Sequence, residues 1–104
     1  MLIKTIIEAL ANTKLPVAYG FFRETPEPPF LVYILASSHN FGADDIVYHP
    51  RDRYNVELYT DRKDPETEKT VQDALDDAEL FWDKTETFVP DEELYQIIYT
   101  IYER

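Results

Sequence analysis

The segment from Leu94 to Tyr102 constrains the fold most strongly, because its apolar residues fall on both alternations of a β-strand. One alternation carries Leu94, Ile98 and Tyr102, and the other carries Tyr95, Ile97, Tyr99 and Ile101. Neighbouring side chains of a strand point to opposite faces of the sheet, so both faces of this strand need cover. Two helices packed on a small sheet cover one face only. Either the sheet curls over the second face, or another copy of the protein covers it.

An apolar strand face rich in tyrosine is typical of an interaction surface when no element of the same chain covers it. Tyr59 adds to this pattern, because it lies on the otherwise polar side of its own strand. We therefore predict an oligomer or partner interface at Tyr59, Tyr95, Ile97, Tyr99 and Ile101. The alternative is that Leu94 to Tyr102 forms a central strand inside an ordinary curled core.

The remaining periodicity predicts helices at 2–12 and from Asp64 onward, together with strands at 17–22, 30–38, 46–48, 53–60, 85–89 and 94–102. Asp64 is a capping residue followed by Pro65 at the first helical position. The inward stripe of this helix is expected at Val71, Ala74, Leu75, Ala78 and Phe81 or Trp82, and its exposed side at Glu68, Asp73, Asp76, Asp77 and Glu79. We therefore expect one α+β domain over 1–104, with a mostly antiparallel sheet of about five to six strands and two helices packed on one face.

The proline-rich segment 23–29 excludes a helix and a central strand, and favours an extended connection or a protruding loop. Together with residues 40–53, it is a natural place for contacts that become ordered on assembly.

Charge and composition bound the function. The chain carries 10 basic and 21 acidic residues, a net charge of −11, which repels a phosphate backbone and makes a sequence-specific nucleic-acid reader the least expected class. The absence of cysteine excludes disulfides, thiol nucleophiles and cysteine-ligated metals. The apolar runs are far shorter than the roughly 20 residues that a membrane span requires. We expect no membrane partner.

No catalytic constellation stands out in the sequence. His39 and His49, with Asp44 and Asp45 between them, fit no standard metal-ligand spacing. The two serines stand outside a Gly-x-Ser-x-Gly motif, and two glycines are too few for a phosphate-binding loop. We expect a binding or assembly protein rather than an enzyme, with no cofactor and no metal.

A more specific signal lies in the sequence Tyr54-Asn-Val-Glu-Leu-Tyr-Thr-Asp-Arg-Lys-Asp-Pro-Glu66, which is followed by an acidic helix and the closing segment Glu92-Glu-Leu-Tyr-Gln-Ile-Ile-Tyr99. This pattern resembles the small tail-completion, or tail-terminator, proteins of long-tailed bacteriophages and prophages. The similarity covers residues 30 to 103, and the opening helix agrees with it. Head–tail joining proteins share the size, acidity and fold style, so the resemblance extends to them.

The resemblance implies a ring subunit, in the virion a hexamer, that caps the head-proximal end of the tail tube and halts its polymerisation. The implied partners are copies of the same chain, the tail tube protein and the head connector. The implied location is the head–tail junction of the virion, and the bacterial host cytoplasm during assembly. The family carries no catalytic residues to transfer.

The acidic residues have a physical purpose in such a ring if some of them line its channel. Their negative charge would repel the phosphates of DNA that passes through, so that the DNA does not bind to the channel wall. The candidate channel-facing acids are Asp44, Asp45, Asp73, Asp76 and Asp77. The alternative is that these acids only solvate the surface and keep the subunit soluble.

A rival function is an acidic inhibitor that mimics DNA and occupies the groove of a nucleic-acid-binding protein. Such a mimic presents carboxylates at phosphate-like spacing over a long surface. Here basic residues interrupt the carboxylates, at Arg51, Arg53, Arg62, Lys63 and Lys69. The interruptions favour assembly over mimicry.

Overall fold

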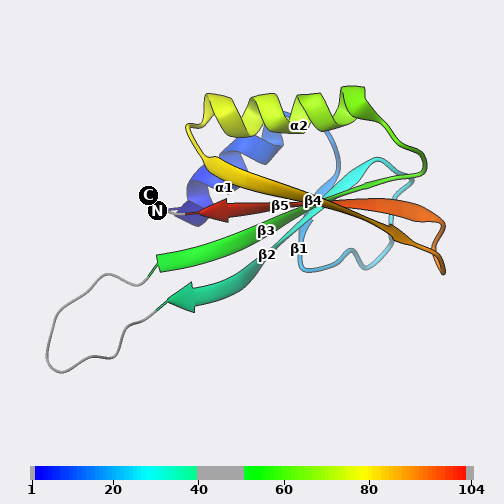
Figure 1. Cartoon of the computed structure of the whole chain (residues 1–104), viewed down its shortest axis with the longest axis horizontal. Helices are drawn as coiled ribbons and strands as arrows, with labels where there is room; N and C mark the ends of the chain where they lie inside the picture. The colour runs from blue at the N-terminus through cyan, green and yellow to red at the C-terminus, as the bar shows by residue number, and fades with distance from the viewer. Residues whose placement is uncertain (1, 40–50, 103–104) are drawn as a thin grey trace, which may run out of the picture.

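The computed structural model describes residues 2–39 and 51–102 as two helices and five strands (Figure 1). In chain order these are α1 (Leu2–Ala11), β1 (Val17–Tyr19), β2 (Phe30–His39), β3 (Arg51–Thr60), α2 (Pro65–Asp77), β4 (Phe81–Val89) and β5 (Leu94–Tyr102). The expected α+β class is confirmed. The strand expected at 46–48 lies outside the described residues. Neither helix is long and apolar enough to span a membrane, in the part of the chain that the structure describes.

The strands form one sheet in the order β1-β2-β3-β5-β4, in which β1 pairs with β2 in parallel and every other pairing is antiparallel. Both helices lie on the same side of this sheet (Figure 1). The mostly antiparallel sheet with helices on one face is therefore confirmed. We call the covered side the helix-covered face and the opposite side the helix-free face.

The core lies between the helices and the helix-covered face. On β3 and β5, Val56 pairs with Tyr99 and Leu58 with Ile97 in register, and all four side chains are fully buried. The helices and β2 complete this core with Ile6, Leu10, Leu31, Val71 and Leu75, also fully buried. The alternation expected for residues 53–60 is confirmed, since Tyr54, Val56, Leu58 and Thr60 are buried and the intervening side chains are partly exposed.

Helix α2 begins where the sequence predicts. The Asp64 carboxylate accepts hydrogen bonds from the Thr67 backbone N–H at 3.2 Å and from the Thr67 hydroxyl at 2.7 Å, and Pro65 occupies the first helical turn. This is the cap that a helix start requires, because the first N–H groups have no partner inside the helix. The hydrogen bonds from Thr67, chiefly the one from its hydroxyl, lower the pKa of Asp64 below its ordinary value.

Three details of the sequence prediction are wrong. Strand β1 ends at Tyr19 rather than at residue 22, because Gly20 adopts a φ of 78° and turns the chain. Phe81 and Trp82 belong to β4 rather than to the end of α2, since Glu79 with a φ of 60° follows the helix. Glu68, expected on the exposed side of α2, is buried. Each error comes from a turn or a distant contact that the periodicity of the sequence does not record.

Candidate functional site

The structure does not bring the five predicted interface residues together. Ile97, Tyr99 and Ile101 are fully buried by the chain's own helices, so the prediction that they face a partner is wrong for these three. Tyr95 lies at the start of β5 on the same face, half-buried against Phe88 with ring centroids 5.1 Å apart. Tyr59 alone points to the helix-free face. The alternation of β5 showed that two faces needed cover, but not which face the helices would take.

Tyr59 is held firmly on the helix-free face. Its hydroxyl donates a hydrogen bond to Glu57 at 2.8 Å and accepts one from the Gln96 amide at 2.8 Å, and its ring stacks on Phe30 with centroids 5.1 Å apart. Burial, together with the hydrogen bond to Glu57, raises the pKa of Tyr59 to about 12. The hydroxyl therefore stays protonated at neutral pH, as a fixed donor on a rigid aromatic ring.

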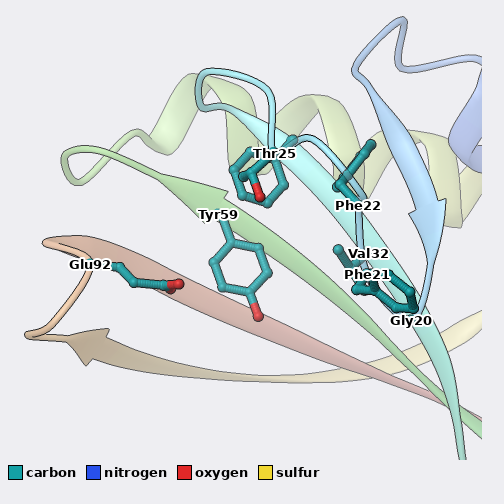
Figure 2. A pocket seen from close by; sticks show the side chains of 8 residues that line it. Gly20, Phe21, Phe22, Thr25, Val32, Tyr59 and Glu92 are labelled. Carbon is teal, nitrogen blue, oxygen red and sulfur yellow. The ribbon is translucent and has the colours of Figure 1, made fainter.

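A pocket opens beside Tyr59, and Figure 2 shows its lining side chains. We call it the aromatic pocket; its lining residues are Gly20, Phe21, Phe22, Thr25, Phe30, Val32, Tyr59 and Glu92. Its volume is about 160 Å³, well below the roughly 300 to 1,000 Å³ of ordinary small-molecule sites. This size favours a single inserted side chain over a cofactor.

Part of the wall of the aromatic pocket comes from Gly20, Phe21 and Phe22, which the sequence analysis assigned to the end of a strand, and from Thr25, which it placed in a connection. The turn at Gly20 leads into Phe21 and Phe22, and Phe21 is 72% exposed, the most exposed large hydrophobic residue that the structure describes. Phe22 packs edge-on against Phe30, with centroids 5.4 Å apart. The sequence did contain a signal for this wall. A glycine followed by two phenylalanines stands directly before the proline-rich segment 23–29, a place where the chain can turn and leave apolar side chains exposed.

A second exposed apolar feature lies at the other end of the molecule, where β2 and β3 run on beyond their neighbours (Figure 1). The pairing of β1 with β2 ends at Tyr33, and the pairing of β5 with β3 ends at Arg53. We call residues 34–39 and 51–53 the protruding arm. Ile34 is 37% exposed and Leu35 is 42% exposed. Both residues pair with β3 residues that also pair with β5, so these exposed apolar side chains lie on the outer strand of the sheet, before β2 and β3 run on beyond it.

A buried charge network ties α2 to β4. Glu68 is only 3% exposed, and its carboxylate lies 2.6 Å from the Lys63 Nζ and 3.1 Å from the Lys84 Nζ. Burial opposes ionisation of Glu68, but the hydrogen bonds from both lysines outweigh it and hold its pKa below the ordinary value. Lys84 also donates to Gln72, which accepts a bond from the Tyr99 hydroxyl at 3.1 Å. The network joins α2 to β4, because each oxygen of the Glu68 carboxylate lies within ion-pair distance of a lysine ammonium group.

Two of the proposed channel-facing acids already have partners within the chain. Asp73 lies 2.8 Å from the Nζ of Lys69 across one helical turn, and Asp76 accepts a hydrogen bond from the Trp82 indole at 2.9 Å. Asp77 is exposed and lines a groove between α1 and α2. All three share the outer side of α2 or its end, whereas Asp44 and Asp45 lie outside the described residues.

The structure offers no support for a metal centre where it describes the chain. In residues 2–39 and 51–102, no three potential His, Asp or Glu ligands gather around a common point. His39 ends β2, and His49 lies outside the described residues. The features that stand out in the described residues are the aromatic pocket and the protruding arm.

The comparisons with known proteins find a likeness of fold. No family model matches the sequence, and no curated protein matches it significantly. Among solved structures, the fold is similar to a chain from the virion of a native gene transfer agent particle, with a TM-score of 0.63 and 12% sequence identity. The likeness covers 93% of this chain and 88% of the other. At this identity it establishes a shared fold over nearly the whole length of both chains.

Proposed function

We propose that the protein is a structural component of a tailed-phage or phage-like particle, and within it a tail-completion subunit. In this role it assembles into a ring at the head-proximal end of the tail tube, stops tube growth and joins the tube to the head connector. The observation that carries the proposal is the fold likeness to a virion chain over 93% of the sequence. The resemblance of residues 30 to 103 to tail-completion and head–tail joining proteins supports the same role independently.

The surface chemistry supports assembly over DNA mimicry. Lys63, Lys69 and Lys84 form ion pairs with carboxylates inside the acidic surface, which breaks the continuous anionic strip that a mimic requires. The apolar protruding arm and the aromatic pocket are features that a subunit uses to recognise other proteins. An acidic surface around them keeps the unassembled chain soluble.

Deletion of the gene from the phage or prophage that encodes the chain tests the proposal. We expect heads and tails that fail to join, and tails of irregular and excessive length, because nothing stops polymerisation of the tube. A plasmid copy should restore normal particles, whereas a frameshifted copy of the same plasmid should not. Electron microscopy of lysates measures both outcomes. Joined particles with tails of normal length in the deletion strain would overturn the proposal.

A further inference from the structure

We propose that two unassembled copies of the chain pair along the outer edges of their β4 strands. The two strands run antiparallel, in the one register that places Thr85 opposite Thr85 of the second copy. The occupant of this edge is thus a second copy of the same chain. This pairing goes beyond the proposed function, because it concerns the chain before it enters a ring.

Strand β4 forms an open edge of the sheet. It pairs with β5 over its whole length, from Phe81 to Val89, and no strand of residues 2–39 and 51–102 pairs with its other side. The pairing with β5 has a continuous register without a bulge, and β4 contains no proline. A long, regular edge of this kind presents unpaired N–H and C=O groups to which another strand can bind.

The polar centre of β4 is complementary to itself. When two antiparallel copies meet at Thr85, residues at equal distances on its two sides lie opposite each other. Lys84 then opposes Glu86 of the second copy, and Asp83 opposes Thr87, whose hydroxyl can donate a hydrogen bond to the carboxylate. Each pair occurs twice because the arrangement is symmetric. Opposite charges placed directly across a ladder stabilise it.

The same charges disfavour the neighbouring registers. Alternate residues of a strand form the ladder hydrogen bonds, so two identical edges pair only when residues of the same alternation lie opposite each other. The nearest other registers that satisfy this condition centre on Lys84 and on Glu86. They place Lys84 opposite Lys84, or Glu86 opposite Glu86, and like charges directly opposite each other destabilise a ladder. Charged residues that commonly prevent edge pairing therefore single out the register centred on Thr85.

This register also covers exposed aromatic residues at both ends of β4. Phe88 is 47% exposed and Phe81 is 59% exposed. In the proposed pair, Phe88 lies opposite Trp82 of the second copy, on the helix-covered face. Phe81 lies opposite Val89, on the helix-free face. Aromatic and β-branched pairs are among the cross-strand contacts that stabilise a sheet, and they remove apolar surface from water.

The symmetry of the contact agrees with the fold. A contact between two identical edges is isologous and has a twofold axis. It joins the two five-stranded sheets into one and keeps the helices of both copies on the same side. Each copy carries a net charge of −11, but repulsion between distant exposed charges is screened beyond about 8 Å at physiological ionic strength. Lys84 and Glu86 meet across one strand spacing, about 4.8 Å, where their attraction persists.

Disulfide trapping measures the register, because the chain has no native cysteine. Thr85→Cys places a thiol opposite the same position of the second copy, so mild oxidation should give a covalent dimer. Thr87→Cys is the matched control, because it lies on the same alternation of β4 and is also exposed. Position 87 lies opposite position 83, so its two copies are about four residues, or about 14 Å, apart along the strands. We expect about tenfold less dimer from this control, since a disulfide does not span that distance.

A charge reversal separates pairing from random collision. Adding Glu86→Lys to the Thr85→Cys variant places a lysine opposite Lys84 of the second copy, and should lower the dimer yield to the level of Thr87→Cys. Adding Glu24→Lys instead makes the same change of net charge between β1 and β2, at the other edge of the sheet, and should leave the yield intact. Circular dichroism checks that each variant folds.

Equal yields from Thr85→Cys and Thr87→Cys, or a yield that Glu86→Lys leaves unchanged, would overturn the pairing. A second copy that binds β4 in another register, or a ring held together only by other surfaces, would give that first result. The ring itself is judged by tail length in the deletion strain, so failure of the pairing and failure of the proposed function are seen in different measurements.

Discussion

Replacement of Glu68 by glutamine is the sharpest test of how the charge network between α2 and β4 works. Glutamine keeps the shape of the side chain but removes its charge, so the carboxylate contacts with Lys63 and Lys84 lose their ionic character. Hydrogen bonds to charged groups contribute about 1.5 to 3 kcal/mol each when buried. Both lysine side chains are substantially exposed and can turn to water, which lowers the loss to about 1 to 2 kcal/mol in total.

The pH dependence of this loss identifies its origin. The folded-state pKa of Glu68 lies below the ordinary value of 4.5, so its ionised form stabilises the protein above that pH. The contribution disappears as the pH falls through the lower folded-state pKa, because the wild-type carboxyl then becomes neutral as well. The stability difference between wild type and Glu68→Gln should therefore be full at pH 7 and should shrink toward zero in acid.

Urea denaturation followed by circular dichroism at several pH values between 7 and 2.5 measures this difference. Asp73→Asn is the matched control, because it removes one carboxylate from an exposed pair on the same helix. We expect the control to leave the unfolding midpoint unchanged at every pH. A Glu68→Gln variant as stable as wild type at pH 7, or one whose deficit is independent of pH, would refute the argument.

The remaining predictions concern the cap, the core and the acidic surface. Asp64→Ala should lower the unfolding free energy by about 1 kcal/mol through loss of the helix cap, measured by urea denaturation; no change would show that the cap is dispensable. Leu75→Ala should cost about 2 to 5 kcal/mol and lower the thermal midpoint by calorimetry, because Leu75 is fully buried. Joint replacement of Asp73, Asp76 and Asp77 by lysine should slow DNA ejection from complemented particles if α2 faces the channel; unchanged ejection would count against that placement.

Local signals allowed a correct prediction of much of the fold. The Asp64-Pro65 step marked the start of α2, since a capping aspartate and a proline both act within one helical turn. The alternation over residues 53–60 correctly separated buried Val56 and Leu58 from the opposite side of β3. These features depend only on residues that are close together in the sequence, so they can be predicted from the sequence alone.

Features set by distant contacts could not be predicted in the same way. Glu68 is charged and was expected on the surface. Lys63 reaches it from the loop before α2, and Lys84 reaches it from β4, sixteen residues further along the chain. The aromatic pocket combines a turn at Gly20 with Tyr59 on β3 and Glu92 in the last hairpin. No periodicity within one segment records such a convergence.

The prediction for β5 was wrong because the helices cover the alternation on which it relied. Ile97, Tyr99 and Ile101 are covered by α1 and α2, which accounts for the most apolar alternation of the last strand. The opposite alternation then faces the helix-free side, where Gln96 serves to fix Tyr59 at the wall of the aromatic pocket. Because the helices use the more apolar alternation of β5, the exposed large hydrophobic residues of the described chain lie away from this core, among them Phe21 beside the pocket, Leu35 on β2 and Phe81 on β4.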